Sequence, residues 1–364
     1  MNTLLLLPAL FASDGGIERI VRLYVRAAGE LSRPGEHVDV IVLNDRLPPD
    51  ARLDAYRTPA LRPPVVCGRR KLSFVWQVLK RARGTGRIIC GHVNLLRVAH
   101  LTRRLNPALE IWLVAHGVEV WRPFSPAEQR MLGSTDRILC VSDYTRRQLA
   151  GQCPGLAASR LIVQANALDP QFSASTVPGA SPTTGLILVI SRLVQADSYK
   201  GVDHLISALP AVRKTVPDAR LRIIGDGDDR GRLEDLALEV GCPEAIEFLG
   251  RVSDADLRRN LAQCQVFALP SRGEGFGLVY LEALAHGKPC IAADAGGAPE
   301  VIDAMSGYLV PYGDVPALAE ACSAALRRNW DPGMLQARAA SFSYEIFRQR
   351  LAALWPASPS SSSS

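Results

Sequence analysis

The sequence predicts an α/β protein of two domains, each built on a parallel sheet with helices on both faces. Three observations lead to this prediction. Short apolar runs alternate with amphipathic segments of helical period along most of the 364 residues. Strands that are apolar along their whole length are typical of parallel sheets, which are buried on both sides. The chain is also longer than the usual single domain of about 100–200 residues.

In the first half of the chain, six apolar runs are expected to form strands, at residues 3–7, 38–43, 87–90, 111–115, 137–141 and 161–164. Amphipathic helices are expected at residues 17–31 and 72–83. The opening MNTLLLLPAL lacks the basic start of a secretion signal, and polar residues follow it at once. It is therefore interpreted as a buried first strand.

In the second half, strands are expected at residues 186–190, 221–224, 246–249, 266–269 and 289–292, and helices at 202–216, 230–239, 254–263 and 280–286. Residues 169–184 are rich in Ser, Thr, Pro and Gly without periodicity and are interpreted as a linker. The predicted domains are residues 1–175 and 176–338. A final segment, 339–356, carries a helix at 344–354 that needs a surface to pack on, and the Ser/Pro tail 357–364 is expected to be disordered.

Basic residues are concentrated in one part of the chain. The net charge is +6, yet no acidic residue lies between Asp54 and Glu110, an interval with 12 Lys or Arg. Such a field favours an anionic partner. Two interpretations of the basic region 57–104 stay open: a helix carrying Phe74 and Trp76 on an anionic membrane surface, or a solvated basic face with both rings in the core.

The eight cysteines form no C-x-x-C pair and no Cys/His cluster with metal-ligand spacing. They are interpreted as reduced core thiols of a cytosolic protein. No apolar run approaches about 18 residues, so no membrane span is expected. The predicted location is the cytoplasm, at the inner face of the membrane if the basic region binds lipid.

Ligands of parallel sheets bind beyond the carboxyl ends of the strands, so the loops that follow strands are the candidates for chemistry. After the first strand, Gly15 and Gly16 open a helix, which suits either an anion site or an ordinary tight turn. After residues 186–190 come Arg192 and, at the next helix start, Lys200. Two cations at the mouth of a sheet suit a diphosphate.

Two further loops contain glycines. Gly225-Asp226-Gly227 lacks the third glycine of the dinucleotide fingerprint, which argues against an NAD site. The loop from Ser271 to Gly277 carries three glycines and leads into a helix, so its N–H groups can meet a phosphate. Glu274 in this loop and Glu282 in the following helix would be costly beside an anion unless they accept hydrogen bonds from sugar or ribose hydroxyls.

These segments resemble the family 4 glycosyltransferases. The resemblance rests on the Glu-x7-Glu block from Glu274 to Glu282, on FLGRVSDADL at 248–257, on the two cations, on Gly15-Gly16 and on FSYE at 342–345. It implies a GT-B fold: two Rossmann-like domains facing across a cleft, the first on the acceptor side, the second binding a nucleotide sugar, and a last helix that packs back on the first domain.

The resemblance also implies residue roles. Arg192 and Lys200 would bind the donor diphosphate, Glu274 the transferred sugar and Glu282 the ribose, while His116 would lie near the reaction centre. In full, catalytic roles are implied for His116, Arg192, Lys200 and Glu274, and donor-binding roles for Gly15, Gly16, Gly225, Arg251, Val252, Phe276, Gly277, Leu278 and Glu282. One departure is that Arg192 and Lys200 are eight positions apart, with an inserted VQADSY turn.

The expected reaction is hexosyl transfer with retention, from GDP-mannose or UDP-glucose to a glycan or lipid-linked oligosaccharide, in bacterial cell-surface polysaccharide synthesis. No cofactor or metal is expected, because no Asp pair stands at a donor loop, and Asp226, Asp228 and Asp229 are interpreted as a solvated helix start. Two alternatives remain: a nucleotide-sugar 2-epimerase of the same fold, and a basic nucleic-acid-binding protein, for which no recognition motif is present.

Overall fold

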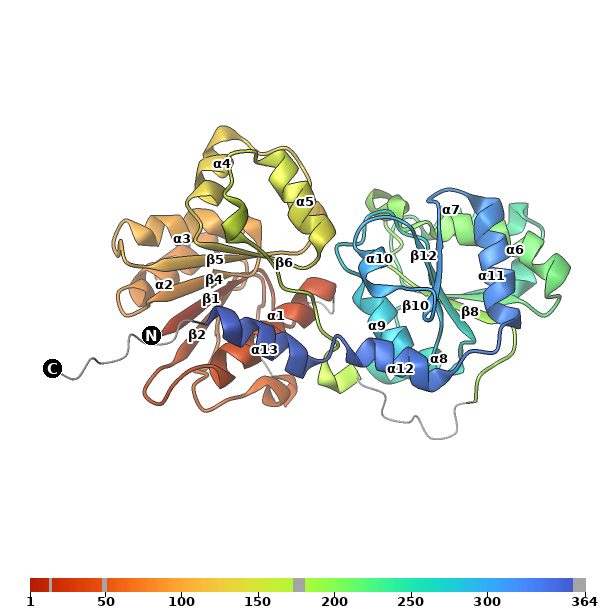
Figure 1. Cartoon of the computed structure of the whole chain (residues 1–364), viewed down its shortest axis with the longest axis horizontal. Helices are drawn as coiled ribbons and strands as arrows, with labels where there is room; N and C mark the ends of the chain where they lie inside the picture. The colour runs from red at the N-terminus through yellow and green to blue at the C-terminus, as the bar shows by residue number, and fades with distance from the viewer. Residues whose placement is uncertain (13–14, 48–50, 173–180, 356–364) are drawn as a thin grey trace. The chain divides into compact units, whose positions relative to one another are not determined.

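The computed structural model describes residues 1–12, 15–47, 51–172 and 181–355, and the chain divides into two compact units (Figure 1). The first unit comprises Met1–Gln171 together with the C-terminal segment from Tyr344, and the second comprises Phe172–Ser343. Each unit holds one sheet in which the strands pair in parallel. The two parallel-sheet α/β domains expected from the sequence are thereby confirmed.

Within the described residues, the sheet of the first unit has seven strands. In order across the sheet they are β3 (Val65–Val66), β2 (Val38–Val42), β1 (Thr3–Leu7), β4 (Arg87–Cys90), β5 (Glu110–Ala115), β6 (Arg137–Cys140) and β7 (Leu161–Val163). The strand order reverses between β1 and β4, which pair directly. Such a reversal opens a crevice at the carboxyl edge of a parallel sheet, where ligands bind.

Helices cover both faces of this sheet. They are α1 (Gly16–Glu30), α2 (Lys71–Ala82), α3 (Leu96–Arg103), α4 (Pro126–Gly133), α5 (Asp143–Gln152) and α13 (Tyr344–Leu354). Phe74 and Val78 of α2 share a buried cluster with Ile111 and Leu113 of β5. Because side chains alternate along a strand, Trp112 points to the opposite face, where its ring meets that of Trp355 at 5.7 Å.

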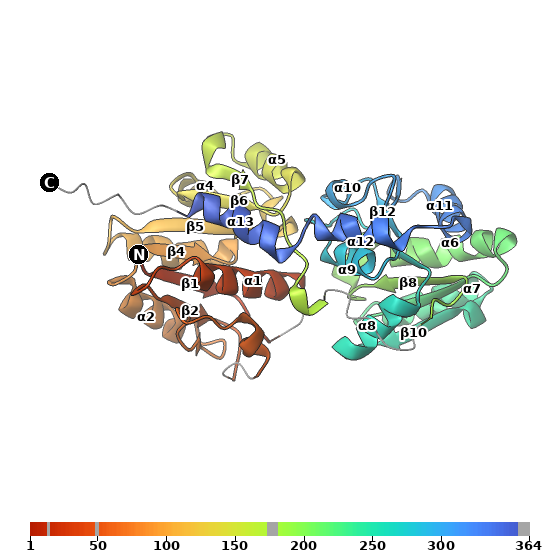
Figure 2. The same cartoon turned by 60° about the horizontal axis from the view of Figure 1, so that its bottom comes forward.

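The last helix, α13, is held on the first unit by contacts along its length. The ring of Phe347 packs edge-on against Tyr24 of α1 at 5.0 Å, and its carbonyl accepts a hydrogen bond from Gln164 Nε2 at 3.0 Å. The hydroxyl of Tyr344 donates to Glu30 at 2.9 Å. Figure 2 shows α13 alongside α1. A segment that follows the second unit in sequence therefore completes the first.

The sheet of the second unit, again within the described residues, has six strands. In order they are β10 (Ile246–Gly250), β9 (Arg220–Ile224), β8 (Leu186–Ile190), β11 (Val266–Leu269), β12 (Cys290–Ala293) and β13 (Gly307–Val310). Its helices are α6 (Val202–Thr215), α7 (Arg230–Glu239), α8 (Asp254–Gln263), α9 (Leu278–Ala285), α10 (Ala298–Val301), α11 (Val315–Arg327) and α12 (Pro332–Ala340). The strand order reverses between β8 and β11, so the loops after these two strands share one crevice.

The eleven strands expected from the sequence all form, with ends within one residue of those expected. The helix expected at 280–286 begins earlier, at Leu278, because Gly277 takes a left-handed conformation (φ 93°) and caps it. Two strands were not expected. β3 has two residues, and β13 begins with glycine and is partly exposed, so neither has a sustained apolar run.

The segment boundary expected at residue 338 falls inside α12 and is corrected to Ser343. Arg338 donates to the carbonyls of Val301 and Glu300 at 2.8 Å each, and Phe342 packs on Phe276 at 5.4 Å. These contacts keep the whole of α12 on the second unit. Residues 173–180 of the expected linker and the tail 357–364 lie outside the described residues.

The cysteines are confirmed as buried free thiols, all eight of them. Burial raises the pKa of the Cys140, Cys264 and Cys322 thiols to about 12, so they stay protonated and weakly nucleophilic at neutral pH. Of the helices that the structure describes, none is both long enough and apolar enough to cross a bilayer.

Candidate functional site

The first loop of the site follows β8, the central strand of the second sheet. Arg192 is two residues beyond the strand, and a 3₁₀ segment, η6 (Gln195–Lys200), brings Lys200 to the start of α6. Gly201, between η6 and α6, takes a left-handed conformation (φ 71°), and a Cβ there would lie 2.6 Å from the carbonyl oxygen of Pro270. Only glycine fits, because the chain turns tightly against the neighbouring loop at this point.

The second loop follows β11, the strand next to β8. Gly297 N donates to the carbonyl of Glu274 at 2.8 Å, and a Cβ on Gly296 would stand 2.5 Å from the same oxygen. The glycines at 296 and 297 thus let the β12 loop press against the loop that carries Glu274. The main chain at Glu274 is therefore held by the loop that follows β12.

The structure brings Lys200 and Glu274 together. Lys200 Nζ forms an ion pair and a hydrogen bond with Glu274 Oε1, and both side chains are largely buried. Burial makes this pair sensitive to its surroundings, because removing one partner leaves the other charge without compensation. The pair stands at the strand-order reversal, where the sheet topology predicts a ligand.

Glu282 lies in α9, with 3% of its surface exposed. Its neighbours Leu281, Ala283 and Leu284 are fully buried. An exposed helix carboxylate, the alternative to a binding role, is therefore ruled out. A charge this far from solvent is costly unless it is hydrogen-bonded, so its place in the helix indicates a specific contact.

Gly225, Arg251 and Val252 follow the two strands on the other side of β8. Gly225 has a positive φ of 141°, and its N–H donates to the carbonyl of Gly250 at 2.9 Å. A Cβ at Gly225 would collide with the carbonyl oxygen of Ser191. The glycine therefore allows the β9 loop to approach the Arg192 loop, and Arg251 and Val252 continue from the β10 end of the same edge.

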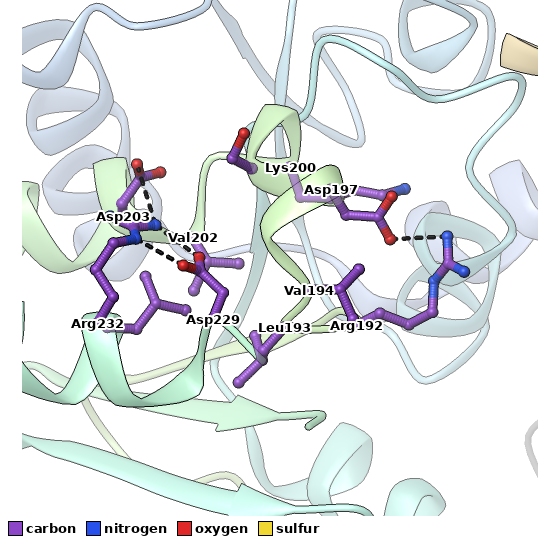
Figure 3. A pocket seen from close by; sticks show the side chains of 11 residues that line it. Arg192, Leu193, Val194, Asp197, Lys200, Val202, Asp203, Asp229 and Arg232 are labelled. Carbon is purple, nitrogen blue, oxygen red and sulfur yellow. Dashed lines mark hydrogen bonds and ion pairs between the residues drawn. The ribbon is translucent and has the colours of Figure 1, made fainter. Parts of the chain in front are cut away.

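A shallow pocket, open to solvent, lies beside the Arg192 loop (Figure 3). Its walls include Arg192, Asp197, Lys200 and the start of α7. Asp229, expected to be a solvated residue at a helix start, is instead buried, with both carboxylate oxygens 2.7 Å from Arg232. That expectation was wrong because Arg232, one turn later on α7, compensates the charge of Asp229. The sequence pattern alone did not indicate this pair.

In the first unit, Gly16 begins α1 and Gly15 is its N-cap. Ser13 and Asp14 of this loop lie outside the described residues. The preceding turn is held by Asp45, a buried residue whose carboxylate accepts from the N–H groups of Leu10, Phe11 and Ala12 at 3.0, 2.8 and 3.3 Å. Three charge-assisted hydrogen bonds to Asp45 thus fix the main chain of this turn.

His116 follows β5 and is half-buried. Its Nε2 lies 2.9 Å from the carbonyl oxygen of Gly91, and since a carbonyl only accepts, Nε2 carries the proton. Its main-chain N–H donates to Glu119 at 2.6 Å. Gly91 therefore orients the ring, and Glu119 holds the main chain of His116.

Sequence reasoning missed His92, which follows β4 at the strand-order reversal. Its Nδ1 accepts from Asn94 N–H at 3.2 Å. Burial lowers the pKa of His92, and the neighbouring His116 and Arg122 lower it further against the opposing effect of Glu119. The imidazole is thus neutral at pH 7. The signal in the sequence was its position, two residues after the strand RIIC.

Among the residues that the structure describes, no group of three or more His, Cys, Asp or Glu side chains gathers as a metal site would require. The site in the second unit contains instead two cations, Arg192 and Lys200, and two carboxylates, Glu274 and Glu282. The cations can hold a diphosphate, and the carboxylates can accept from hydroxyl groups.

Two family models match the chain: "Glycosyltransferase Family 4" over residues 15–172 and "Glycosyl transferases group 1" over residues 184–328. A GDP-mannose-dependent monoacylated alpha-(1-6)-phosphatidylinositol monomannoside mannosyltransferase of Corynebacterium glutamicum is 35% identical over 238 residues, 60% of this chain and 61% of the relative. A GDP-mannose-dependent alpha-(1-6)-phosphatidylinositol monomannoside mannosyltransferase of Mycolicibacterium smegmatis is 35% identical over 247 residues, 61% of this chain and 62% of the relative. These alignments thus span less than two thirds of either relative.

Solved structures are similar over almost the whole chain. Anabaena HepE, in complex with UDP and glucose, superposes with a TM-score of 0.78 at 21% identity, covering 97% of this chain and 99% of that one. The lipopolysaccharide outer core galactosyltransferase WaaB gives 0.72 at 18% identity, covering 98% and 99%. At such identities the likeness concerns the fold alone, and it confirms the GT-B class expected from the sequence.

Proposed function

This chain belongs to the family 4 glycosyltransferases, and we propose that it moves a hexose from a nucleotide-diphosphate sugar to a hydroxyl-bearing acceptor. The observation that carries the proposal is the Lys200–Glu274 ion pair at the strand-order reversal of the second unit, with Glu282 buried in the helix that follows. This observation supports a role for Lys200 in binding the diphosphate and for the two carboxylates in binding the hydroxyls of sugar and ribose.

In the proposed reaction, the bond between the anomeric carbon and the diphosphate oxygen breaks as the acceptor oxygen bonds to that carbon. Arg192 and Lys200 stabilise the charge that develops on the departing diphosphate, which is usually the largest catalytic term. The departing phosphate oxygen takes the acceptor's proton from the same face, so the anomeric configuration is retained. Because these two cations can carry the diphosphate charge, no metal or cofactor is required.

The donor that we propose is GDP-mannose, with UDP-glucose as the other candidate. The named curated relatives are GDP-mannose-dependent, whereas HepE was solved with UDP and glucose. Because the named curated relatives are mannosyltransferases, we favour transfer over the alternative of a nucleotide-sugar epimerase. We assign the first unit to the acceptor side and the second unit to the donor.

A thermal-shift panel of GDP-mannose, UDP-glucose and ADP-glucose tests the donor site. A donor at 100 times its dissociation constant should stabilise the fold by about 2.7 kcal/mol. The shift is expected with one nucleotide class in the wild type and should vanish in Glu282→Ala, measured against that variant's own unliganded Tm. Glu320→Ala, which removes an exposed carboxylate of α11, is the matched control and should keep the shift. A wild type that responds to no donor would contradict the proposed function.

We also propose that the acceptor is lipid-linked and is met at an anionic membrane surface through α2. The two curated relatives named above act on phosphatidylinositol mannosides.

On α2, Phe74 is buried, as the solvated-face interpretation expected, but Trp76 is 57% and Leu72 87% exposed. Lys80 Nζ lies 5.2 Å from the centre of the Trp76 ring, and Arg69, Arg70 and Lys71 lead into the helix. Exposed apolar side chains among cations suit the lipid headgroup region. This proposal implies that the protein is located peripherally at the inner face of the membrane.

Vesicle co-sedimentation tests this surface. Burying one Leu-sized side chain is worth about 1.5–3 kcal/mol, so Leu72→Ser with Trp76→Ser should lower partitioning into anionic vesicles at least about tenfold. Binding of the wild type should also fall as salt rises, because exposed charges are screened. Leu238→Ser, at an exposed apolar position of α7, is the control and should bind like the wild type. Equal binding by the double variant would rule out α2 as the contact.

A further inference from the structure

The turn VQADSY, which separates the two cations of the site, has a buried carboxylate at its centre. Asp197 lies inside η6 with 8% of its surface exposed. Burying a carboxylate is costly unless charges or hydrogen bonds compensate it, so its partners indicate why the turn is built this way.

One partner of Asp197 is Arg192. Arg192 Nη2 lies 2.7 Å from Asp197 Oδ2, as Figure 3 shows, although the arginine side chain is itself 73% exposed. A long exposed side chain samples many rotamers and loses that freedom when a ligand binds it. An ion pair with a fixed carboxylate removes part of this loss in advance, and the guanidinium keeps further N–H groups for a ligand.

The other partner is Tyr199, which links Asp197 to the second loop of the site. Burial raises the pKa of Tyr199, and the negative charge of the neighbouring Asp197 raises it further, so the hydroxyl stays protonated beside the carboxylate. The ring packs on Gly273, where any Cβ would collide with it. The carbonyl of Tyr199 accepts from Arg272 N–H at 3.1 Å. Lys200 is the next residue and pairs with Glu274.

We propose that Asp197 is a positioning residue of the donor site: it holds Arg192 ready for the diphosphate and, through Tyr199, ties that cation to the loop of Lys200 and Glu274. The inference rests on the proposed function and deepens it. The inserted turn is then a brace that keeps two cations, eight positions apart in sequence, in one arrangement. The opposite role, in which Asp197 competes with the diphosphate for Arg192, predicts the reverse sign of effect.

Calorimetry with nucleoside diphosphates and monophosphates tests the proposal. The probes are GDP, GMP, UDP and UMP, and the base bound best by the wild type is followed. Asp197→Asn keeps the size of the side chain but loses its charge, and should weaken diphosphate binding about tenfold while leaving monophosphate binding within twofold. Asp218→Asn alters an exposed carboxylate outside this pocket and should change neither. A general loss of structure would weaken both ligands together.

A double variant separates positioning from direct contact. If Asp197 acts through Arg192, adding Asp197→Asn to Arg192→Ala should weaken diphosphate binding no further. Tyr199→Phe, which keeps the ring and loses the hydroxyl, should give a smaller loss of the same kind. Unchanged or tighter diphosphate binding by Asp197→Asn would overturn the inference and leave the donor site standing. A wild type that binds none of the four probes would overturn the proposed function as well.

Discussion

Replacing Lys200 by alanine is expected to lower kcat by about 10²–10³-fold, the usual cost of removing one preorganised charge that stabilises a transition state. Two effects act together. The cation that would offset the charge on the departing diphosphate is lost, and Glu274 is left without its partner, facing an anionic donor. Initial rates with the donor chosen by the thermal-shift panel, using a nucleotide-release assay, measure the effect.

Two control variants accompany this experiment. Lys214→Ala removes an exposed cation at the far end of α6 and should leave kcat unchanged. Lys200→Arg keeps the positive charge but changes the shape of the side chain, and should recover only part of the activity. Lysine and arginine side chains are not interchangeable at a buried site. A Lys200→Ala enzyme with the kcat of the wild type would mean that this cation does not meet the developing charge.

Replacing Phe347 by alanine is expected to destabilise the first unit by about 3–5 kcal/mol, the typical cost of truncating a buried phenylalanine. Phe347 is fully buried against Tyr24, and its own backbone carbonyl takes the hydrogen bond from Gln164. The loss should leave the second unit unaffected, because α13 belongs to the first. Urea unfolding followed by tryptophan fluorescence should therefore show an early transition that the wild type lacks.

Arg350→Ala, at an exposed position on the same helix, serves as the control and should change the free energy of unfolding by less than about 0.5 kcal/mol. If Phe347→Ala unfolded in a single transition at the midpoint of the wild type, the packing of α13 would contribute little to the first unit.

The sequence was sufficient for eleven of the thirteen described strands and for the loops that carry the candidate site residues. Runs such as LILVI and VFALP are apolar at every position, and only a sheet buried on both faces accepts that pattern. In a parallel sheet the chemistry stands after the strands, so Arg192 and the loop from Ser271 could be located by reading the chain alone. β3, with two residues, and the partly exposed β13 gave no such pattern, because edge strands need not be apolar throughout.

The partners of the site residues could not be read from the sequence. Lys200 and Glu274 are 74 residues apart, and they meet because β8 and β11 are neighbours in a sheet whose order reverses there. Asp197 looked like part of an insertion, and only its burial against Arg192 and Tyr199 reveals a brace. His92 was overlooked because a lone histidine after a strand carries no pattern until the fold places it beside His116.

By itself, then, the sequence determined the fold class, the apolar strands and the loops that carry charge, because hydrophobic periodicity and strand-end position are local properties of the chain. The tertiary structure decided which charges pair, that Trp76 is exposed while Phe74 is buried, and that α13 completes the first unit. Those outcomes depend on which strands become neighbours and which helix face remains uncovered. Both follow from the packing of segments far apart in the chain, which no window of sequence contains.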